Sequence, residues 1–208
     1  LAKAPTDDGY LQHTYYDIGQ VRAFAYDSSR RRLYLTRTAT GSQTSLRYVD
    51  FANWCRIDRT SSFGGSRSGT TREDAVPDGL ELRGIALSNE TDPLATVRRA
   101  YLTARIYDAA AAASAGARVG DFDGLLLVVD LAEDAAGKEE FRIVDQIPVG
   151  HGAGDVRVLP RGTRTGRDVV AALAEDDGVL WIYDDETGGL AAVGRDPFTG
   201  APLVGHGP

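Results

Sequence analysis

Four β-type runs bounded by turn-forming residues occupy Leu80 to Gly152, and this four-run unit recurs along the chain. Its runs are LELRGIALS, RRAYLTARI, GLLLVVDL and FRIVDQIPVGHG. Turn-rich or insert-like segments separate them, as expected for successive strands. A single four-stranded unit cannot bury both of its faces, so it needs neighbours of its own kind. The sequence therefore predicts several similar units packed against one another.

Short sequence matches indicate further copies of the unit on both sides. The pattern RRxYLT occurs at Arg31–Thr36 and Arg98–Thr103, and VGHG occurs at Val149–Gly152 and Val204–Gly207. The third runs each end on an aspartate after apolar residues, as RYVD, LVVD and WIYD. The first runs each place an arginine after an apolar residue. Four independent patterns at matching places are typical of a repeat architecture.

The repeats predict one continuous segment over residues 1–208. Its parts are units at about 20–60, 80–150 and 155–196, outer-strand remnants at 10–19 and 197–208, and a long loop at 61–79. The loop is predicted because Ser, Gly, Arg and Thr dominate it without apolar periodicity. A fourth strand of the first unit is expected near Trp54–Asp58. The alanine run Ala109–Ala113 fits either a short surface helix or a loop.

Apolar residues occur on both faces of the expected strands, which is typical of a sheet covered on two sides. In Leu80–Ser88, for example, strict alternation predicts Leu82 on one face and Ile85 on the other. A propeller blade between two other blades is such a sheet, so we predict an all-β propeller of four-stranded antiparallel blades. Propellers have about four to eight blades. Because the chain supplies about three full blades plus terminal strands, we expect another polypeptide, or a missing part of the same propeller, to complete the ring.

Composition excludes several functional classes. The formal net charge of −7 argues against a nucleic-acid-binding protein, which normally carries a basic surface. Cys55 is the single cysteine, so an internal disulfide and a multi-cysteine zinc site are both excluded, and we interpret it as a buried small apolar residue. The longest apolar run, Leu125–Val129, is too short for a transmembrane segment. The sequence indicates no particular cofactor.

The repeat motifs resemble a known family. YLTR at Tyr34–Arg37 and YLTA at Tyr101–Ala104, placed between GIALS-type first strands and VVDL-type third strands, resemble the YVTN-type β-propeller repeat. Propellers of this kind include bacterial extracytoplasmic surface-layer-like proteins, lactonase-like proteins and the haem d1-binding domain of nitrite reductases. The resemblance covers about 15–207 and departs from the usual pattern in its long inserts and in lacking a Ser-Pro-Asp-Gly turn. It implies an extracytoplasmic location, in the periplasm or at the cell surface.

Three arginines form the first candidate binding group. Arg22, Arg83 and Arg157 each follow an apolar residue in the first strand of a unit. The first strand of a propeller blade lies nearest the axis, so these side chains are expected to form an arc at the channel mouth. Guanidinium groups that converge there would bind a carboxylate or phosphate bidentately. In the alternative, each arginine pairs with an acidic residue of its own or the next blade, such as Asp155 or Asp17.

Two histidines form the second candidate group. His151 and His206 occupy the same place in the two VGHG segments, where one blade is expected to connect to the next. Their imidazoles would then flank a shared ligand, metal or haem. In the alternative, each ring bonds to a backbone carbonyl or an acid and fixes the junction. A metal site ordinarily needs three or four ligands and His13 is the one other histidine, so no metal site is predicted.

The sequence supports catalysis more weakly than it supports ligand binding by these arginines and histidines. The chain has no GxSxG nucleophile elbow. The acidic pairs Asp176-Asp177 and Asp184-Asp185 lack EF-hand spacing and fit hairpin turns better than a Ca²⁺ site. We therefore expect a non-catalytic, extracytoplasmic binding or scaffold protein that uses a propeller face or channel mouth for a protein, a polymer or a small anionic ligand. The alternative is a lactonase-like or metal-dependent hydrolase with its site in the central channel.

Overall fold

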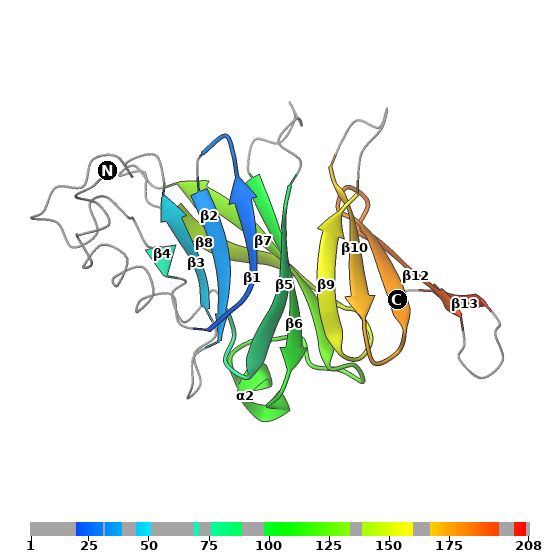
Figure 1. Cartoon of the computed structure of the whole chain (residues 1–208). Helices are drawn as coiled ribbons and strands as arrows, with labels where there is room; N and C mark the ends of the chain where they lie inside the picture. Colours follow the sequence, from blue (N-terminus) through cyan, green and yellow to red (C-terminus); the bar gives the residue numbers. More distant parts are fainter. Residues whose placement is uncertain are drawn as a thin grey trace, which may run out of the picture.

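The computed structural model describes residues 20–30, 32–38, 45–50, 69–70, 76–88, 98–133, 139–159, 167–195 and 202–206. These residues are mostly β-strand and form three sheets that lie side by side (Figure 1). Every pair of neighbouring strands is antiparallel, and strands follow one another within each sheet in sequence order. Two of the sheets have the predicted four antiparallel strands, and the third has five.

The first sheet contains β1 (Gln20–Asp27), β2 (Arg32–Thr38), β3 (Ser45–Asp50) and β4 (Gly69–Thr70). The fourth strand expected near Trp54–Asp58 lies outside the described residues, as does the expected remnant at 10–19. Strand β4 instead falls inside the stretch predicted as a loop. Its two residues carry no apolar alternation, and they are a strand because their backbone pairs with Arg47 and Tyr48 of β3.

The second sheet contains β5 (Leu80–Leu87), β6 (Arg98–Ile106), β7 (Gly124–Glu133) and β8 (Glu139–Pro148). Between β6 and β7 the alanine run forms helix α2 (Ala109–Ser114). The Asp108 side chain caps this helix by accepting hydrogen bonds from the backbone N–H groups of Ala110 and Ala111. Ala112 is buried on its inner side. The cap and this packing favour the helix over the loop.

The third sheet contains β9 (Ala153–Val158), β10 (Val169–Ala174), β11 (Val179–Asp184), β12 (Gly189–Arg195) and β13 (Pro202–His206). Its fifth strand, β13, pairs along β12 and lies within the stretch expected as an outer-strand remnant. The acidic pairs of this sheet lie at two hairpin turns, as the sequence predicts. Gly178 and Gly188 supply the positive φ angles, 64° and 70°, that these turns require.

Two hydrophobic clusters join the three sheets. The first cluster lies between the first and second sheets and contains Leu125 and Leu127. The second lies between the second and third sheets and contains Leu126 and Val128. Alternate residues of β7 therefore enter different clusters, as the pleat of a strand dictates. The second sheet is consequently buried on both faces.

The first strands of the three sheets lie next to one another, since β1 contacts β5 and β5 contacts β9. Gly84 permits the close approach of β5 to β9. At Gly84 a Cβ atom would lie 2.9 Å from the Gly154 carbonyl oxygen and 3.1 Å from the Val156 nitrogen. Both are backbone atoms of β9, so a side chain at this position would push β5 and β9 apart. The small residues of LELRGIALS thus set the spacing of neighbouring sheets.

Candidate functional site

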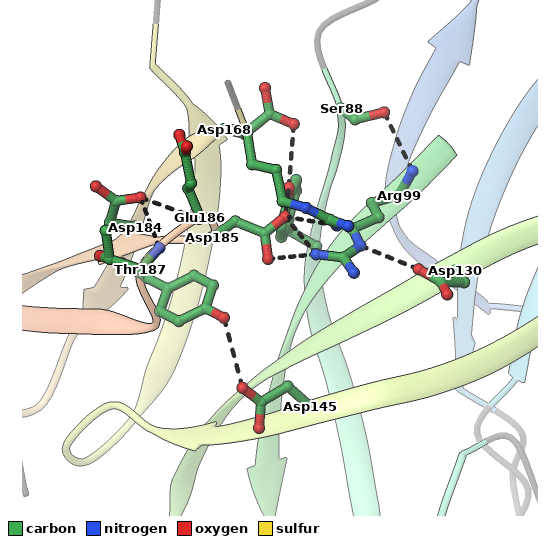
Figure 2. A network of polar contacts seen from close by, with 12 residues as sticks. Ser88, Arg99, Asp130, Asp145, Asp168, Asp184, Asp185, Glu186 and Thr187 are labelled. Atoms are coloured by element: carbon green, nitrogen blue, oxygen red, sulfur yellow. Dashed lines mark hydrogen bonds and ion pairs between the residues drawn. The ribbon is translucent and has the colours of Figure 1, made fainter. Parts of the chain in front are cut away.

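A group of five polar side chains, here named the Arg99 cluster, joins the second and third sheets (Figure 2). Its members are Arg99, Tyr101, Asp130, Asp168 and Asp185. The Arg99 guanidinium group donates through Nε to Asp130 Oδ1 at 3.0 Å and through Nη1 to both oxygens of Asp185 at 2.5 Å. Asp130 belongs to the same sheet as Arg99, whereas Asp185 directly follows β11 of the third sheet. One cation therefore connects carboxylates from two sheets.

The Tyr101 hydroxyl lies between two carboxylates of the third sheet. Its oxygen is 3.0 Å from Asp168 Oδ2 and 2.9 Å from Asp185 Oδ2. Tyr101 is fully buried, and its ring belongs to the hydrophobic cluster between the two sheets. The ring thus supplies apolar packing while the hydroxyl satisfies buried carboxylate oxygens.

Strand geometry explains why these side chains meet. Arg99 and Asp130 are directly paired residues of β6 and β7, so their side chains leave the sheet on the same face. Tyr101 is two residues after Arg99 and shares that face. Asp168 and Asp185 are joined by a backbone hydrogen bond just outside β10 and β11, which brings their carboxylates together.

Electrostatic effects in the cluster follow from burial and charge. Burial alone would lower the pKa of the Arg99 guanidinium, but the hydrogen bond and charge of Asp185, followed by those of Asp130, outweigh it and raise that pKa. Burial, followed by the charges of Asp185 and Asp168, raises the pKa of the Tyr101 hydroxyl far above its ordinary value. Arg99 is therefore a permanent cation and Tyr101 a permanent neutral donor. These properties suit a fixed connection between sheets.

Sequence reasoning did not predict the Arg99 cluster, although three of its five members belong to repeated motifs. Arg99 and Tyr101 belong to the RRxYLT repeat, and Asp130 is the aspartate that ends LVVD. The sequence patterns were interpreted only as marking the positions of strands. The contact of Arg99 with Asp185 spans 86 positions of the chain, so only the packing of the sheets reveals it.

His151 lies in the connection between β8 and β9, as predicted, and forms a second polar group there. Its Nδ1 is 3.0 Å from Asp177 Oδ1, and its Nε2 is 3.2 Å from the backbone carbonyl of Asp121. Both partners accept hydrogen bonds, so the ring makes both contacts fully only when both nitrogens carry protons. The hydrogen bond that the His151 ring donates to the Asp177 carboxylate is the main reason that the pKa of His151 is raised above its ordinary value.

Neighbouring groups fix the loop around His151. The ring of Phe122 packs edge-on against the imidazole, with centroids 5.3 Å apart. Arg105 bridges Asp123 at 2.9 Å and Asp176 at 3.0 Å. The carboxylates of the β10–β11 turn are thus paired with Arg105 of β6 and with His151 of the β8–β9 connection. This arrangement corresponds to the predicted alternative in which His151 stabilises a junction.

His206 occupies a different local structure. It lies in β13, where its backbone pairs with Ala191 of β12, whereas His151 lies in a connection. The expected equivalence of the two VGHG segments is therefore not seen in the backbone. A ligand shared by the two histidines stays a prediction.

The three predicted arginines fall into two groups. Arg22 and Arg83 both contact the Glu81 carboxylate, at 3.0 and 3.2 Å, and both occupy a β-bulge of a first strand. Arg157 pairs with Asp155 at 2.8 Å, which is a pairing that the sequence alternative names. The corresponding bulge of β9 lies between Ala153 and Val156, so Arg157 is not equivalent to the other two. Anion binding by these residues stays a prediction.

Apolar side chains are exposed on the outward faces of the first and third sheets. On β1, Phe24 is 69% exposed and Tyr26 is also largely exposed. On the third sheet, Val193 is 57% exposed, and Leu180 beside it is exposed as well. The exposed residues alternate with residues that enter the hydrophobic clusters. Each terminal sheet therefore has one face in a hydrophobic cluster and exposed apolar residues on the other face, where Leu35 and Ala171 are themselves buried.

Comparison of the chain with models of protein families, with curated proteins and with solved structures gave no match. Among the described residues, no group of His, Cys, Asp and Glu side chains is arranged to hold a metal ion. The helical part of the described chain contains no segment with the length and apolar character needed to cross a membrane.

Proposed function

We propose that this chain is a β-propeller segment that acts as a non-catalytic, extracytoplasmic binding or scaffold protein, and that the outward faces of its terminal sheets bind a protein partner. The observation that carries the proposal is the contrast in burial between equivalent strands. Phe24 of β1 and Ile85 of β5 occupy the same register position, yet Phe24 is 69% exposed and Ile85 is 3% exposed. The location rests on the sequence resemblance.

The propeller part of the proposal is supported by strand order and by sheet contacts. In each sheet the strand order follows the chain, and the first strands of successive sheets are neighbours. Successive blades around an axis have this arrangement, with their first strands innermost. The bulges at Arg22 and Arg83 recur at the same register in the first two sheets, as repeated units require.

The binding part is supported by the chemistry of the exposed face of β1. This face carries two exposed aromatic residues, Phe24 and Tyr26, whereas Arg22 at the preceding bulge contacts Glu81 of the second sheet. Aromatic residues and arginine are enriched at protein interfaces. Contiguous apolar surface of this kind marks interaction sites more often than scattered exposed residues do. A protein surface therefore fits this face better than a small anion.

Site-specific photocrosslinking tests the proposal. A photoreactive phenylalanine analogue replaces Phe24 in one protein and Val193 in another, and the matched control carries it at Val144, an exposed position on β8 of the second sheet. We expect one defined polypeptide, identified by mass spectrometry, to be crosslinked at positions 24 and 193 and not at 144. Crosslinking at all three positions alike, or at none, would refute the proposal.

Lactonase-like or metal-dependent hydrolysis stays a prediction from the sequence. A proton-release assay with simple γ- and δ-lactones, with and without added Ca²⁺ or Zn²⁺, tests it directly. Turnover that is lost in Arg83→Gln would favour hydrolysis at the channel over the binding role.

A further inference from the structure

Each contact between sheets in this chain joins two unlike faces. We name the face of a sheet that packs on the next sheet of the chain its downstream face, and the opposite face its upstream face. The downstream face of the first sheet carries Tyr34 and Leu46, and it packs on the upstream face of the second sheet. The downstream face of the second sheet carries Tyr101 and Leu126, and it packs on the upstream face of the third. Sheets thus associate downstream to upstream.

This pattern leaves two faces on which none of the three described sheets packs: the upstream face of the first sheet and the downstream face of the third. The upstream face of the first sheet carries Phe24, because Ala23 and Ala25 on either side of it pack into the first cluster. The downstream face of the third sheet carries Leu180 and Val193, which are paired in the ladder. Trp181 and Tyr183 of β11 turn the other way, into the second cluster. One upstream and one downstream face therefore carry exposed apolar residues.

The exposed upstream face has a direct counterpart within the chain. Phe24 pairs with Leu35 in the same register as Ile85 pairs with Leu102, each just after a bulge. In the second sheet this position is covered by the downstream face of the first sheet. The partner that fits Phe24 is therefore the downstream face of another such sheet. The third sheet has a face of that kind. Besides Asp184 at the end of β11, it carries apolar residues of β10, β11 and β12: Val169, Ala171, Leu173, Leu180, Ile182, Ala191 and Val193.

We infer that the occupant of both exposed faces is a second copy of this chain. The third sheet of each copy packs on the first sheet of the other, so that two chains close a ring of six sheets. A head-to-tail contact repeated by a two-fold axis closes without leaving a free end. Six sheets also fall within the four to eight blades of closed propellers. This inference rests on the proposed function and names its partner.

The mass of the purified full chain in solution tests the inference. Light scattering after gel filtration, repeated over a hundredfold range of concentration, should give twice the chain mass of 22.3 kDa. Phe24→Asp and Val193→Asp should each give the single-chain mass, because each damages both contacts of the ring. Val144→Asp, which introduces the same charge on the second sheet, should keep the mass of two chains. Circular dichroism of the variants checks that each is folded.

Mixing the two single-chain variants gives the sharpest result. In a mixed pair, one contact carries both aspartates and the other carries none, so a one-to-one complex should form in the mixture alone. A complex of Val193→Asp with itself would show instead that like faces associate, and would overturn the inference. A wild-type chain of single mass, or an open series of larger assemblies, would also overturn it. If the wild-type chain is single but position 24 crosslinks to another polypeptide, the proposed function stands and only this inference falls.

Discussion

Replacing Arg99 with methionine should destabilise the protein strongly, because this guanidinium group connects carboxylates from two sheets. The Arg99 side chain is 16% exposed, and the side chains of Asp130 and Asp185 are at least as well buried. Methionine keeps the aliphatic stem and removes the charge. The variant therefore isolates the loss of the ion pairs from the loss of packing.

The size of the effect follows from what remains around the two carboxylates. Removing one partner of a buried ion pair costs about 3–5 kcal/mol, because the other charge is left uncompensated. Two cations stay nearby: Arg167 Nη1 is 3.8 Å from Asp185 Oδ2, and Arg142 Nη2 is 3.1 Å from Asp130 Oδ2. We therefore expect the lower end of that range, about 3 kcal/mol.

Urea unfolding followed by far-UV circular dichroism measures this loss. For a slope of roughly 2 kcal/mol per molar urea, the midpoint should fall by roughly 1.5 M. Arg142→Met is the matched control, because Arg142 contacts the same Asp130 from a side chain that is 77% exposed. Exposed ion pairs contribute about 0–1 kcal/mol, so the control midpoint should fall by at most roughly 0.5 M.

A double-mutant cycle decides whether the ion pair causes the loss. Asp185→Asn removes the charge that Arg99 compensates, so the double variant should be more stable than the sum of the two single losses predicts, by at least about 1 kcal/mol. Additivity within about 0.5 kcal/mol would refute the reasoning. So would an Arg99→Met loss no larger than that of Arg142→Met.

Two further changes test how the sheets are held together. Gly84→Ala should cost about 1–3 kcal/mol, since its Cβ would crowd backbone atoms of β9, whereas Gly120→Ala, where a Cβ meets nothing within 4 Å, should be nearly neutral in the same urea assay. Folding raises the pKa of His151 above its ordinary value of 6.5, so the protonated ring stabilises the folded protein at pH values below 6.5. This stabilisation is lost as the pH rises through the higher pKa of the folded protein. The loss should be at most about 1 kcal/mol and smaller in Asp177→Asn, as judged by thermal unfolding between pH 5 and 9.

Most strands could be predicted from the sequence because local pattern determines them. The four runs of the second unit carry alternating or continuous apolar residues between turn-forming segments, and all four are strands. Strand β4 could not be predicted, because Gly69 and Thr70 are strand residues only through their pairing with β3. Helix α2 could be stated only as one of two possibilities. Its outcome depends on the Asp108 cap and on the burial of Ala112 against other parts of the chain.

The arginines show why a short sequence match does not determine a site. An apolar residue followed by arginine occurs in all three first strands. The face of the sheet on which the arginine side chain lies depends on the register of the strand. A bulge adds one residue to a strand and reverses the faces on one side of it. Arg22 and Arg83 occupy such bulges and share the Glu81 carboxylate. Arg157 lies beyond the bulge of its strand and pairs with Asp155, so an arc of three equivalent guanidinium groups would require a register that β9 does not have.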